Sequence, residues 1–393
     1  MTESDGVVTG GGWAPDESTA TANPTVAGGG DRSVPPADDA VAVEGPAPTA
    51  RDGTVKAAAT AAWVFRQGQT PLRVSPRELP DLVEDDANVA WIDLSTYTAS
   101  DLRDLAAGLG LPPAAVDAAL APWQRPRLDV FGDQFRVSAT VADLDVEGPR
   151  VRAHAGELDL FVRRNALLSA HRRPLPFADR VLARARQSSE LPRLDAAYLL
   201  YVVLDELLHH AERLCEAQED AIAVLEERAV GEPGTSFLAD LVDRKRVVFA
   251  LGRLVDQHRE VFAAFLRPEF RPVANEAIAP YFRDLEGRLE HLLGRFADAK
   301  SAVDGAFDLY VSQMAQRTNE VMRLLTVVST VLLPTTVILG FFGTSFEGVP
   351  LYTRAAFVAM ALLVLLVTVT ILVAFRRRGW LAPNRDAYGR RSV

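Results

Sequence analysis

The sequence contains a single cysteine, Cys215, so one chain forms no internal disulfide. Structural disulfides are typical of oxidising compartments, and the soluble part of the chain is therefore predicted to be cytosolic, with Cys215 a small core residue rather than a nucleophile. The N-terminus also lacks the basic region and the apolar run of a signal peptide. Membrane insertion would have to be directed by a later segment.

The sequence also has no excess of basic residues. The 393 residues include 42 lysines and arginines against 52 aspartates and glutamates, a formal net charge of −10. Nucleic-acid phosphates bind to basic surfaces, so nucleic acid is not expected as a partner, whereas an acidic surface suits cations. The sequence has neither a P-loop nor a convincing pair of nucleophile and base, which argues against an enzyme.

The first 54 residues contain almost no large apolar side chains. They cannot bury enough surface to offset the entropy lost on ordering, so we predict a disordered tail. Further on, apolar runs at residues 89–94 and 158–162 are typical of strands and alternate with short helical patches. This alternation predicts a compact α/β domain over residues 55–190.

Strand signals stop after this domain, and apolar residues recur at helical spacing from residue 196 to about residue 230, before a Gly-Pro turn at 231–234. The predicted helix is rich in acidic residues, which form either a solvated face, the commoner case, or a region where cations accumulate. Its adjacent His209 and His210 cannot share a helical face as paired metal ligands would. The acidic residues are Asp205, Glu206, Glu212, Glu216, Glu219, Asp220, Glu226 and Glu227, against the bases Arg213 and Arg228.

A second, longer helix is predicted from residue 280 to residue 342, with Pro334 near its end. At about 1.5 Å per residue, it would be a rod on the order of 90 Å long. Its apolar residues alternate at spacings of four and three, a heptad pattern that predicts packing against partner helices, including helices from other copies of the chain. These residues are Leu285, Leu289, Leu292, Phe296, Ala299, Val303, Ala306 and Tyr310.

Two segments, residues 324–342 and 355–375, contain no charged residue. Each reaches the roughly 20 residues that cross a hydrocarbon core of about 30 Å, and two such runs side by side argue against a buried soluble helix pair. Arginines flank the outer ends, at Arg323 and at 376–378, whereas the loop between the spans holds only Arg354. The positive-inside rule therefore predicts a multi-pass protein with both termini in the cytoplasm.

The first span differs from the second in carrying several hydroxyl side chains, Pro334 and Gly340. Such residues are better tolerated inside a membrane where they face protein or water. Because two helices cannot enclose a pore, a water-facing stripe would require several copies around one axis; the alternative is a helix interface without a pore. The stripe consists of Asn319, Met322, Leu325 or Thr326, Ser329, Leu333, Thr336 and Gly340.

Several segments, taken in order, resemble the CorA family of magnesium transporters over about residues 90–382. No single segment would identify the family, but the whole set in this order is specific for it. They are WIDL at 91–94, QRPRL at 124–128, YLLY at 198–201, YFRD at 281–284, NEVMRLLT at 319–326, LPTT at 333–336, GFFGTSF at 340–346 and FRRRGWL at 375–381.

The resemblance implies an α+β membrane protein: a homopentamer with a cytoplasmic α/β domain, a long helical stalk that continues into a pore-lining first span, and a second span facing lipid. Asp284 matches an acidic residue that helps bind regulatory divalent cations between subunits; Asp143 and Asp145 lie in the region of its partner acid, and the alternative is a local pair with Arg288. The pore would be lined by Asn319, Met322, Leu325, Leu333, Thr336 and Gly340, with Met322 and Leu325 as the hydrophobic constriction.

The sequence departs from the family at the outer end of the first span, where the family's Gly-Met-Asn signature is replaced by Gly343, Thr344 and Ser345. The asparagine that meets the hydrated ion is therefore absent. The following loop keeps Glu347, but the acid that usually follows Pro350 is replaced by Leu351. These changes bear on selectivity for magnesium, and on transport itself.

The expected function is transport of a divalent cation, Mg²⁺ first, across the plasma membrane, with the cation as substrate and regulator and no other cofactor. The alternatives are a zinc or cobalt/nickel transporter of the same architecture, and a CorA-like scaffold that does not conduct. The expected organisation is a tail (1–54), an α/β domain (55–190), long helices and stalk (191–323), the first span (324–342), an external loop (343–354), the second span (355–375) and a cytoplasmic tail (376–393).

Overall fold

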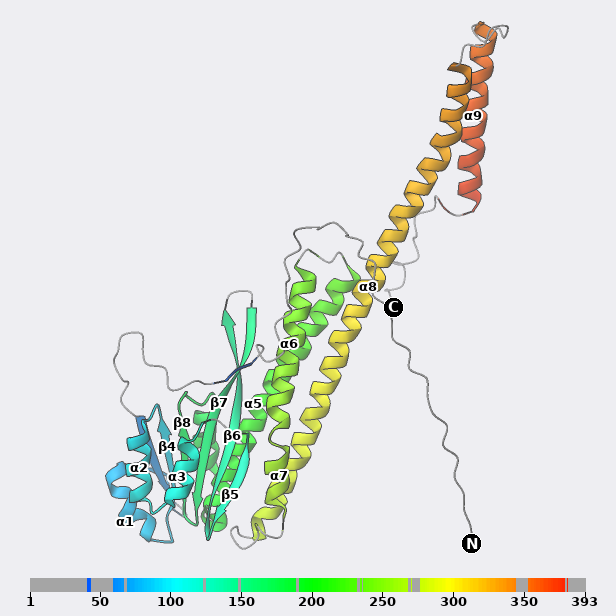
Figure 1. Ribbon diagram of the computed structural model, residues 1–393. Helices are drawn as coiled ribbons and strands as arrows, with labels where there is room; N and C mark the ends of the chain where they lie inside the picture. The colour runs from blue at the N-terminus through cyan, green and yellow to red at the C-terminus, as the bar shows by residue number, and fades with distance from the viewer. Residues whose placement is uncertain are drawn as a thin grey trace, which may run out of the picture. The chain divides into compact units, whose positions relative to one another are not determined.

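The structure is a computed structural model, and its described part combines one mixed sheet with a set of long helices (Figure 1). The described residues are 41–43, 59–66, 69–122, 125–147, 150–188, 191–231, 234, 236–267, 270, 276–343, 353–378 and 380.

The sheet has eight strands in the order β3-β2-β4-β8-β7-β6-β5, with β1 paired to β7 outside this path. The β4–β8 and β1–β7 pairs are parallel and the others antiparallel. The predicted runs at 89–94 and 158–162 lie in β4 and β7. The strands are β1 Val41–Val43, β2 Ala59–Phe65, β3 Leu72–Val74, β4 Val89–Ser95, β5 Arg127–Phe131, β6 Gln134–Glu147, β7 Arg150–Arg163 and β8 Ala166–His171.

Both faces of the sheet are covered by helices, because its central strands are apolar on both sides. In β4, Ile92 packs with the helices α1 (Leu79–Glu84), α2 (Ala99–Gly108) and α3 (Pro113–Leu120), whereas Trp91 packs in the core on the other face. The short 3₁₀ helix η2 (Pro76–Glu78) leads into α1.

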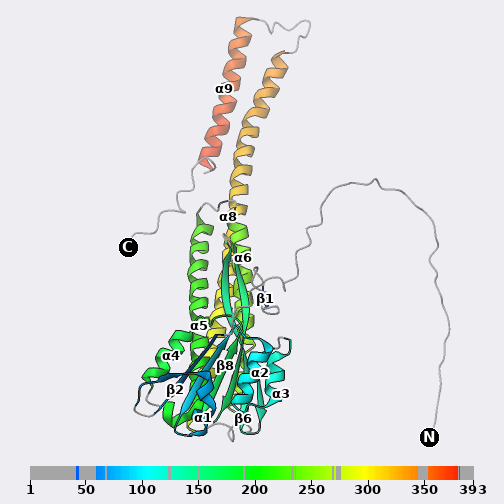
Figure 2. The ribbon, with the colours of Figure 1, turned by 90° about the vertical axis from the view of Figure 1, so that its left-hand side faces the viewer.

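Long helices form the other layer (Figure 2). In α5, Asp195 has a left-handed φ of 62°, so the regular helix begins at Ala196, as predicted. Figure 1 shows α5, α6 and α8 running side by side. The elements are α4 Ala178–Gln187, α5 Leu191–Val230, α6 Phe237–Asp256, α7 Arg259–Phe265, the 3₁₀ helix η4 Glu276–Ile278, α8 Ala279–Gly343 and α9 Arg354–Arg377.

The heptad stripe of α8 is buried within the chain itself, so it does not require helices from other copies. Leu285, Leu289 and Leu292 are at most 1% exposed. The stripe packs against α5, α6 and α7 in one continuous core. Heptad spacing reports that an apolar face is covered, but it does not tell which chain covers it.

The prediction of a tail disordered over residues 1–54 is wrong at Val41–Val43, which forms strand β1. β1 pairs with Ala153–Ala155 of β7. β8 pairs with β7 only over residues 158–163, so the edge of β7 before residue 158 offers unpaired backbone groups. Compositional bias predicts that a segment cannot form a core of its own, but a strand needs only an edge to pair with.

His258, at the junction of α6 and α7, ties these helices to the sheet. Its Nε2 accepts a hydrogen bond of 3.0 Å from the backbone N–H of Thr140 in β6, and its Nδ1 lies 3.1 Å from the carbonyl oxygen of Leu254. These partners require a proton on Nδ1 and a bare Nε2. Burial lowers the pKa of His258 to about 4.

We predict that His258→Ala lowers the free energy of unfolding by about 2–4 kcal/mol, because it leaves the N–H of Thr140 unsatisfied and opens a cavity. The unfolded chain binds a proton at the ordinary pKa of 6.5, whereas the folded chain binds it only near pH 4. The stability that neutral His258 supplies is therefore complete above pH 6.5 and is lost as the pH falls toward 4.

Urea unfolding followed by tryptophan fluorescence measures both effects, since Trp63 and Trp91 stack in the sheet at 4.9 Å between ring centroids. His291→Ala, at an exposed histidine of α8, is the matched control. An unchanged difference between wild type and His258→Ala from pH 7 to pH 4.5 would contradict this account of the pH dependence.

Candidate functional site

The two charge-free segments lie in adjacent helices. Residues 324–342 form the end of α8, and residues 355–375 lie within α9. Both helices are long and apolar enough to cross a membrane, and only 6% and 0% of their apolar windows are buried in the single chain. A helix that is apolar all round needs lipid or further protein around it.

α9 covers one face of α8. The α8 residues whose exposure is reduced recur at intervals of three and four, as expected for a helix face in contact with a neighbour. They are Val327, Val331, Pro334, Thr335, Ile338 and Phe342. The residues of α9 with reduced exposure are Ala356, Met360, Val364, Val367, Thr368, Ile371 and Phe375.

The stripe predicted to line a pore lies on the opposite face of α8. Met322 and Leu333 are 56% and 68% exposed, and the other members of the stripe are exposed as well. At about 100° per residue, the centre of the stripe is roughly 170° from the centre of the α9 contact. The hairpin of spans therefore leaves the whole stripe uncovered.

The four threonine hydroxyls of the first span are satisfied within the helix. Thr326, Thr330 and Thr336 each donate a hydrogen bond of 2.7–2.9 Å to the carbonyl oxygen four residues earlier. Thr335, on the α9 side, does the same to Val331. Such bonds lower the cost of a hydroxyl in lipid. The threonine hydroxyls therefore do not by themselves determine which face of α8 meets water.

The spans are also joined at the end of α9 that is nearest the arginine run. The guanidinium carbon of Arg323 lies 5.5 Å from the ring centroid of Trp380, and Trp380 also packs on Phe375 at 5.4 Å. At the other end, α8 stops at Gly343. Thr344, Ser345 and Glu347, the rest of the predicted mouth, lie outside the described residues.

Asp284 is exposed on α8, in a broad shallow hollow lined also by Arg283, Gly287 and His291. Asp284 makes no ion pair with Arg288, its partner in the alternative prediction, although Arg288 lines the same hollow and Asp284 acts on it electrostatically. Arg288 turns to α5, where it binds Asp205 and donates a 2.9 Å bond to Glu212. Among the described residues, Asp284 has no ion pair.

Asp143 and Asp145 are not brought to Asp284 within the chain. Asp143 lies 3.7 Å from Nε2 of His210, and Asp145 lies 3.3 Å from Nδ1 of His154. Burial lowers the pKa of His210. Over the described part of the chain, no cluster of three or more such side chains is arranged to hold a metal ion.

Sequence reasoning missed the main charged cluster. Asp205 and Glu206 of the acidic helix are buried, and Asp205 is bound by Arg184 of α4 as well as by Arg288. The predicted solvated face is confirmed for Glu216, Asp220, Glu226 and Glu227, which are exposed. Further along α5, Glu219 accepts a hydrogen bond of 3.1 Å from Nε of Arg295 in α8. The sequence pattern considers only the bases of the same helix, Arg213 and Arg228. The arginines that bind these carboxylates come instead from α4 and α8.

Cys215 lies in this contact between α5 and α8 and is fully buried. Burial, with Glu219 nearby, raises the pKa of its thiol to about 12. The thiol is therefore protonated at neutral pH and is a core residue, as predicted, because the thiolate is the reactive form.

The chain is similar in sequence to metal-ion transport proteins. The cobalt/magnesium transport protein CorA of Thermotoga maritima is 25% identical over 300 residues, which cover 76% of this chain and 85% of that protein. The zinc transport protein ZntB of Klebsiella pneumoniae is 27% identical over 296 residues, or 74% and 85% of the two chains.

Solved structures share the fold. The complete CorA magnesium transporter of Methanocaldococcus jannaschii superposes with a TM-score of 0.68 at 18% identity, covering 82% of this chain and 98% of that one. A family model described as CorA-like Mg²⁺ transporter protein matches residues 86–377. Because this match takes in strands β4 to β8, the long helices and both spans, the chain belongs to the CorA family of membrane metal-ion transporters, which are not enzymes.

Proposed function

We propose that this chain conducts divalent cations, Mg²⁺ first, through a homopentameric pore in the plasma membrane. The proposed lining is the uncovered stripe of α8, formed by Asn319, Met322, Leu325, Leu333, Thr336 and Gly340, with Met322 and Leu325 as the constriction. The position of α9 on the opposite face carries this proposal. α9 would face lipid while the stripes of several copies meet around one axis.

The two termini and the α/β domain would lie in the cytoplasm, with the arginines that flank the spans on the same side. The driving force would be the membrane potential, which contributes about 2.3 kcal/mol per charge per 100 mV and therefore about twice that for a divalent ion. The proposal of a pentamer is based on the family resemblance and on the exposed stripe of α8, which needs partners. The heptad stripe of α8 does not support it, because that stripe is buried within the chain.

The fold alone does not determine which ion is transported. One relative is named for cobalt and magnesium and another for zinc, so zinc, cobalt and nickel are second candidates. The Gly343-Thr344-Ser345 mouth favours a broader choice of ion. A scaffold that does not conduct is the third candidate, and a flux measurement separates it from the others.

We predict that the full chain, reconstituted as a pentamer in liposomes, supports Mg²⁺ flux and that modification of Leu333→Cys by a charged methanethiosulfonate blocks it. Such reagents attack thiols in water, and Leu333 lies on the stripe. Val328→Cys is the control, because Val328 is exposed in the single chain but lies about 140° around the helix from Leu333. The buried Cys215 contributes little background.

Two results would oppose the pore. Absence of flux for any divalent cation would favour the scaffold, and equal block in Leu333→Cys and Val328→Cys would remove the distinction between the two faces. A dimer by native mass spectrometry would exclude a pore shared by five copies.

We also propose that Asp284 contributes to a divalent-cation site between subunits, since its carboxylate is an exposed hard ligand without an ion pair among the described residues. Asp284→Ala should raise the Mg²⁺ concentration that half-protects the soluble domain from protease by about tenfold, equivalent to about 1.4 kcal/mol. Asp298→Ala, at another exposed carboxylate of α8, is the control. Equal protection in wild type and Asp284→Ala would show that Asp284 is a solvated stalk residue.

The mouth is predicted to discriminate weakly among divalent cations. Mg²⁺ keeps much of its hydration shell, so selection depends on hydrogen bonds to coordinated water, and serine reaches less far than asparagine. A loss of about 0.5 kcal/mol per subunit would total about 2.5 kcal/mol over five, or on the order of seventy-fold in affinity. Glu347 would partly compensate by attracting cations.

Restoring the family residues with Thr344→Met and Ser345→Asn should therefore strengthen Mg²⁺ flux against competing cobalt, nickel or zinc. Each single substitution serves as a control for the pair. Strong selectivity in the unmodified chain that the double substitution leaves unchanged would show that the mouth does not work in this way.

A further inference from the structure

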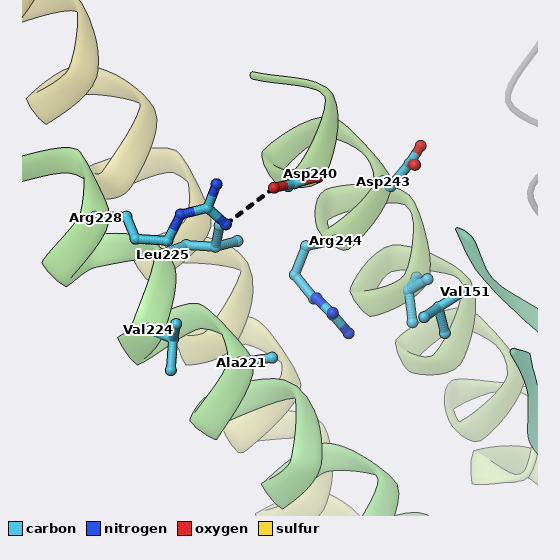
Figure 3. Close-up of a pocket in the computed structure, with 9 residues that line it drawn as sticks. Val151, Ala221, Val224, Leu225, Arg228, Asp240, Asp243 and Arg244 are labelled. Carbon is cyan, nitrogen blue, oxygen red and sulfur yellow. Dashed lines mark hydrogen bonds and ion pairs between the residues drawn. The ribbon is translucent and has the colours of Figure 1, made fainter. Parts of the chain in front are cut away.

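A hollow of about 360 Å³ lies between α5, α6 and β7, away from the spans (Figure 3). Ala221 and Leu225 of α5, Val247 of α6 and Val151 of β7 give it apolar walls. Its volume is at the low end for a ligand site, so it suits a small molecule with a short apolar body.

The charges around the hollow are mostly matched. Nη1 of Arg228 donates a 2.9 Å bond to Asp240, the dashed contact in Figure 3, and Asp243 lies 3.9 Å from Arg246. Arg244 is the other cation among the described lining residues. It makes no ion pair in the described part of the chain, although Asp240 and Asp243 act on it electrostatically at longer range.

Arg244 extends from α6 between the walls of the hollow (Figure 3). Its Nη1 donates a 2.7 Å bond to the buried side chain of Gln218, which fixes the guanidinium in place. Its Nε is buried without a hydrogen-bond partner in the described part of the chain. Burial lowers the pKa of Arg244, so this cation is partly desolvated.

We propose that this hollow binds a small organic monocarboxylate, with the carboxylate on Arg244 and the apolar body against Ala221, Leu225 and Val247. A guanidinium presents a planar fork of donors that matches a carboxylate, and a partly buried cation gains most from such a partner. The site is separate from the proposed pore and from Asp284.

The charges at the rim decide between kinds of anion. In the lining, Arg228 and Arg244 balance Asp240 and Asp243, so a bound anion with two negative charges leaves one more uncompensated charge near these aspartates than an anion with a single charge does. A phosphate monoester carries close to two charges at neutral pH, so it should bind less well than a carboxylate. The apolar walls favour a carboxylate with several methylene groups over acetate.

The test uses the full chain in detergent with sodium hexanoate as the probe. Isothermal titration should detect saturable binding of hexanoate and weaker binding of acetate, hexan-1-ol and hexyl phosphate. This ranking separates the contributions of charge, apolar length and a second negative charge. Binding of hexan-1-ol as tight as that of hexanoate would overturn the assignment to Arg244.

Arg244→Gln should weaken hexanoate binding at least about tenfold, as expected for loss of a charged hydrogen bond. Arg253→Gln, at an exposed arginine of α6 outside the lining of the hollow, is the matched control and should bind as the wild type does. Because Arg244→Gln also disturbs Gln218, Ala221→Phe provides an independent test: it fills the hollow, keeps the guanidinium and should abolish binding.

Equal hexanoate affinity in wild type and Ala221→Phe would show that binding occurs elsewhere and would overturn the proposal. Absence of hexanoate binding to the wild type would do the same. If Arg244→Gln instead dissociated the oligomer while the wild type ignored hexanoate, the guanidinium would serve a carboxylate of a neighbouring copy.

Discussion

The structure depends on how the single helix α8 is covered along its length. Its first half buries leucines in a core shared with α5, α6 and α7, whereas its second half presents apolar side chains that one chain leaves largely exposed. Apolar surface on this scale requires lipid or further copies. The same helix therefore belongs to a soluble core at one end and to the membrane at the other, without a break to uncouple the two.

Buried charge fixes the soluble end of this helix. Asp205 of α5 is bound by Arg288 of α8 and by Arg184 of α4, so three helices share one carboxylate. Removing both arginines would leave the buried carboxylate uncompensated, which costs more than the loss of an exposed pair. Asp284 lies one helical turn before Arg288. A cation on Asp284 would therefore act on a part of α8 that is held tightly to its neighbours.

The position of α9 determines which face of α8 remains uncovered in its apolar second half. By covering one face of α8, α9 leaves the opposite stripe for other partners, and the contact of Arg323 with Trp380 ties the two spans together near the arginines. Because of this contact, movement of α8 in the membrane would carry with it the end of α9 that is nearest the arginines.

Properties that depend on local sequence were determined by the sequence alone. Charge-free runs of sufficient length and flanking arginines indicated the spans, apolar periodicity indicated the long helices, and the ordered motifs indicated the CorA family. Only the tertiary structure decided which surface meets which. It gave the heptad stripe partners from the same chain, paired the acidic helix with bases about 80 residues away, turned Arg288 from Asp284 to Asp205, and placed α9 opposite the stripe. A helix period specifies a face, but the neighbour of that face depends on packing between segments far apart in the chain.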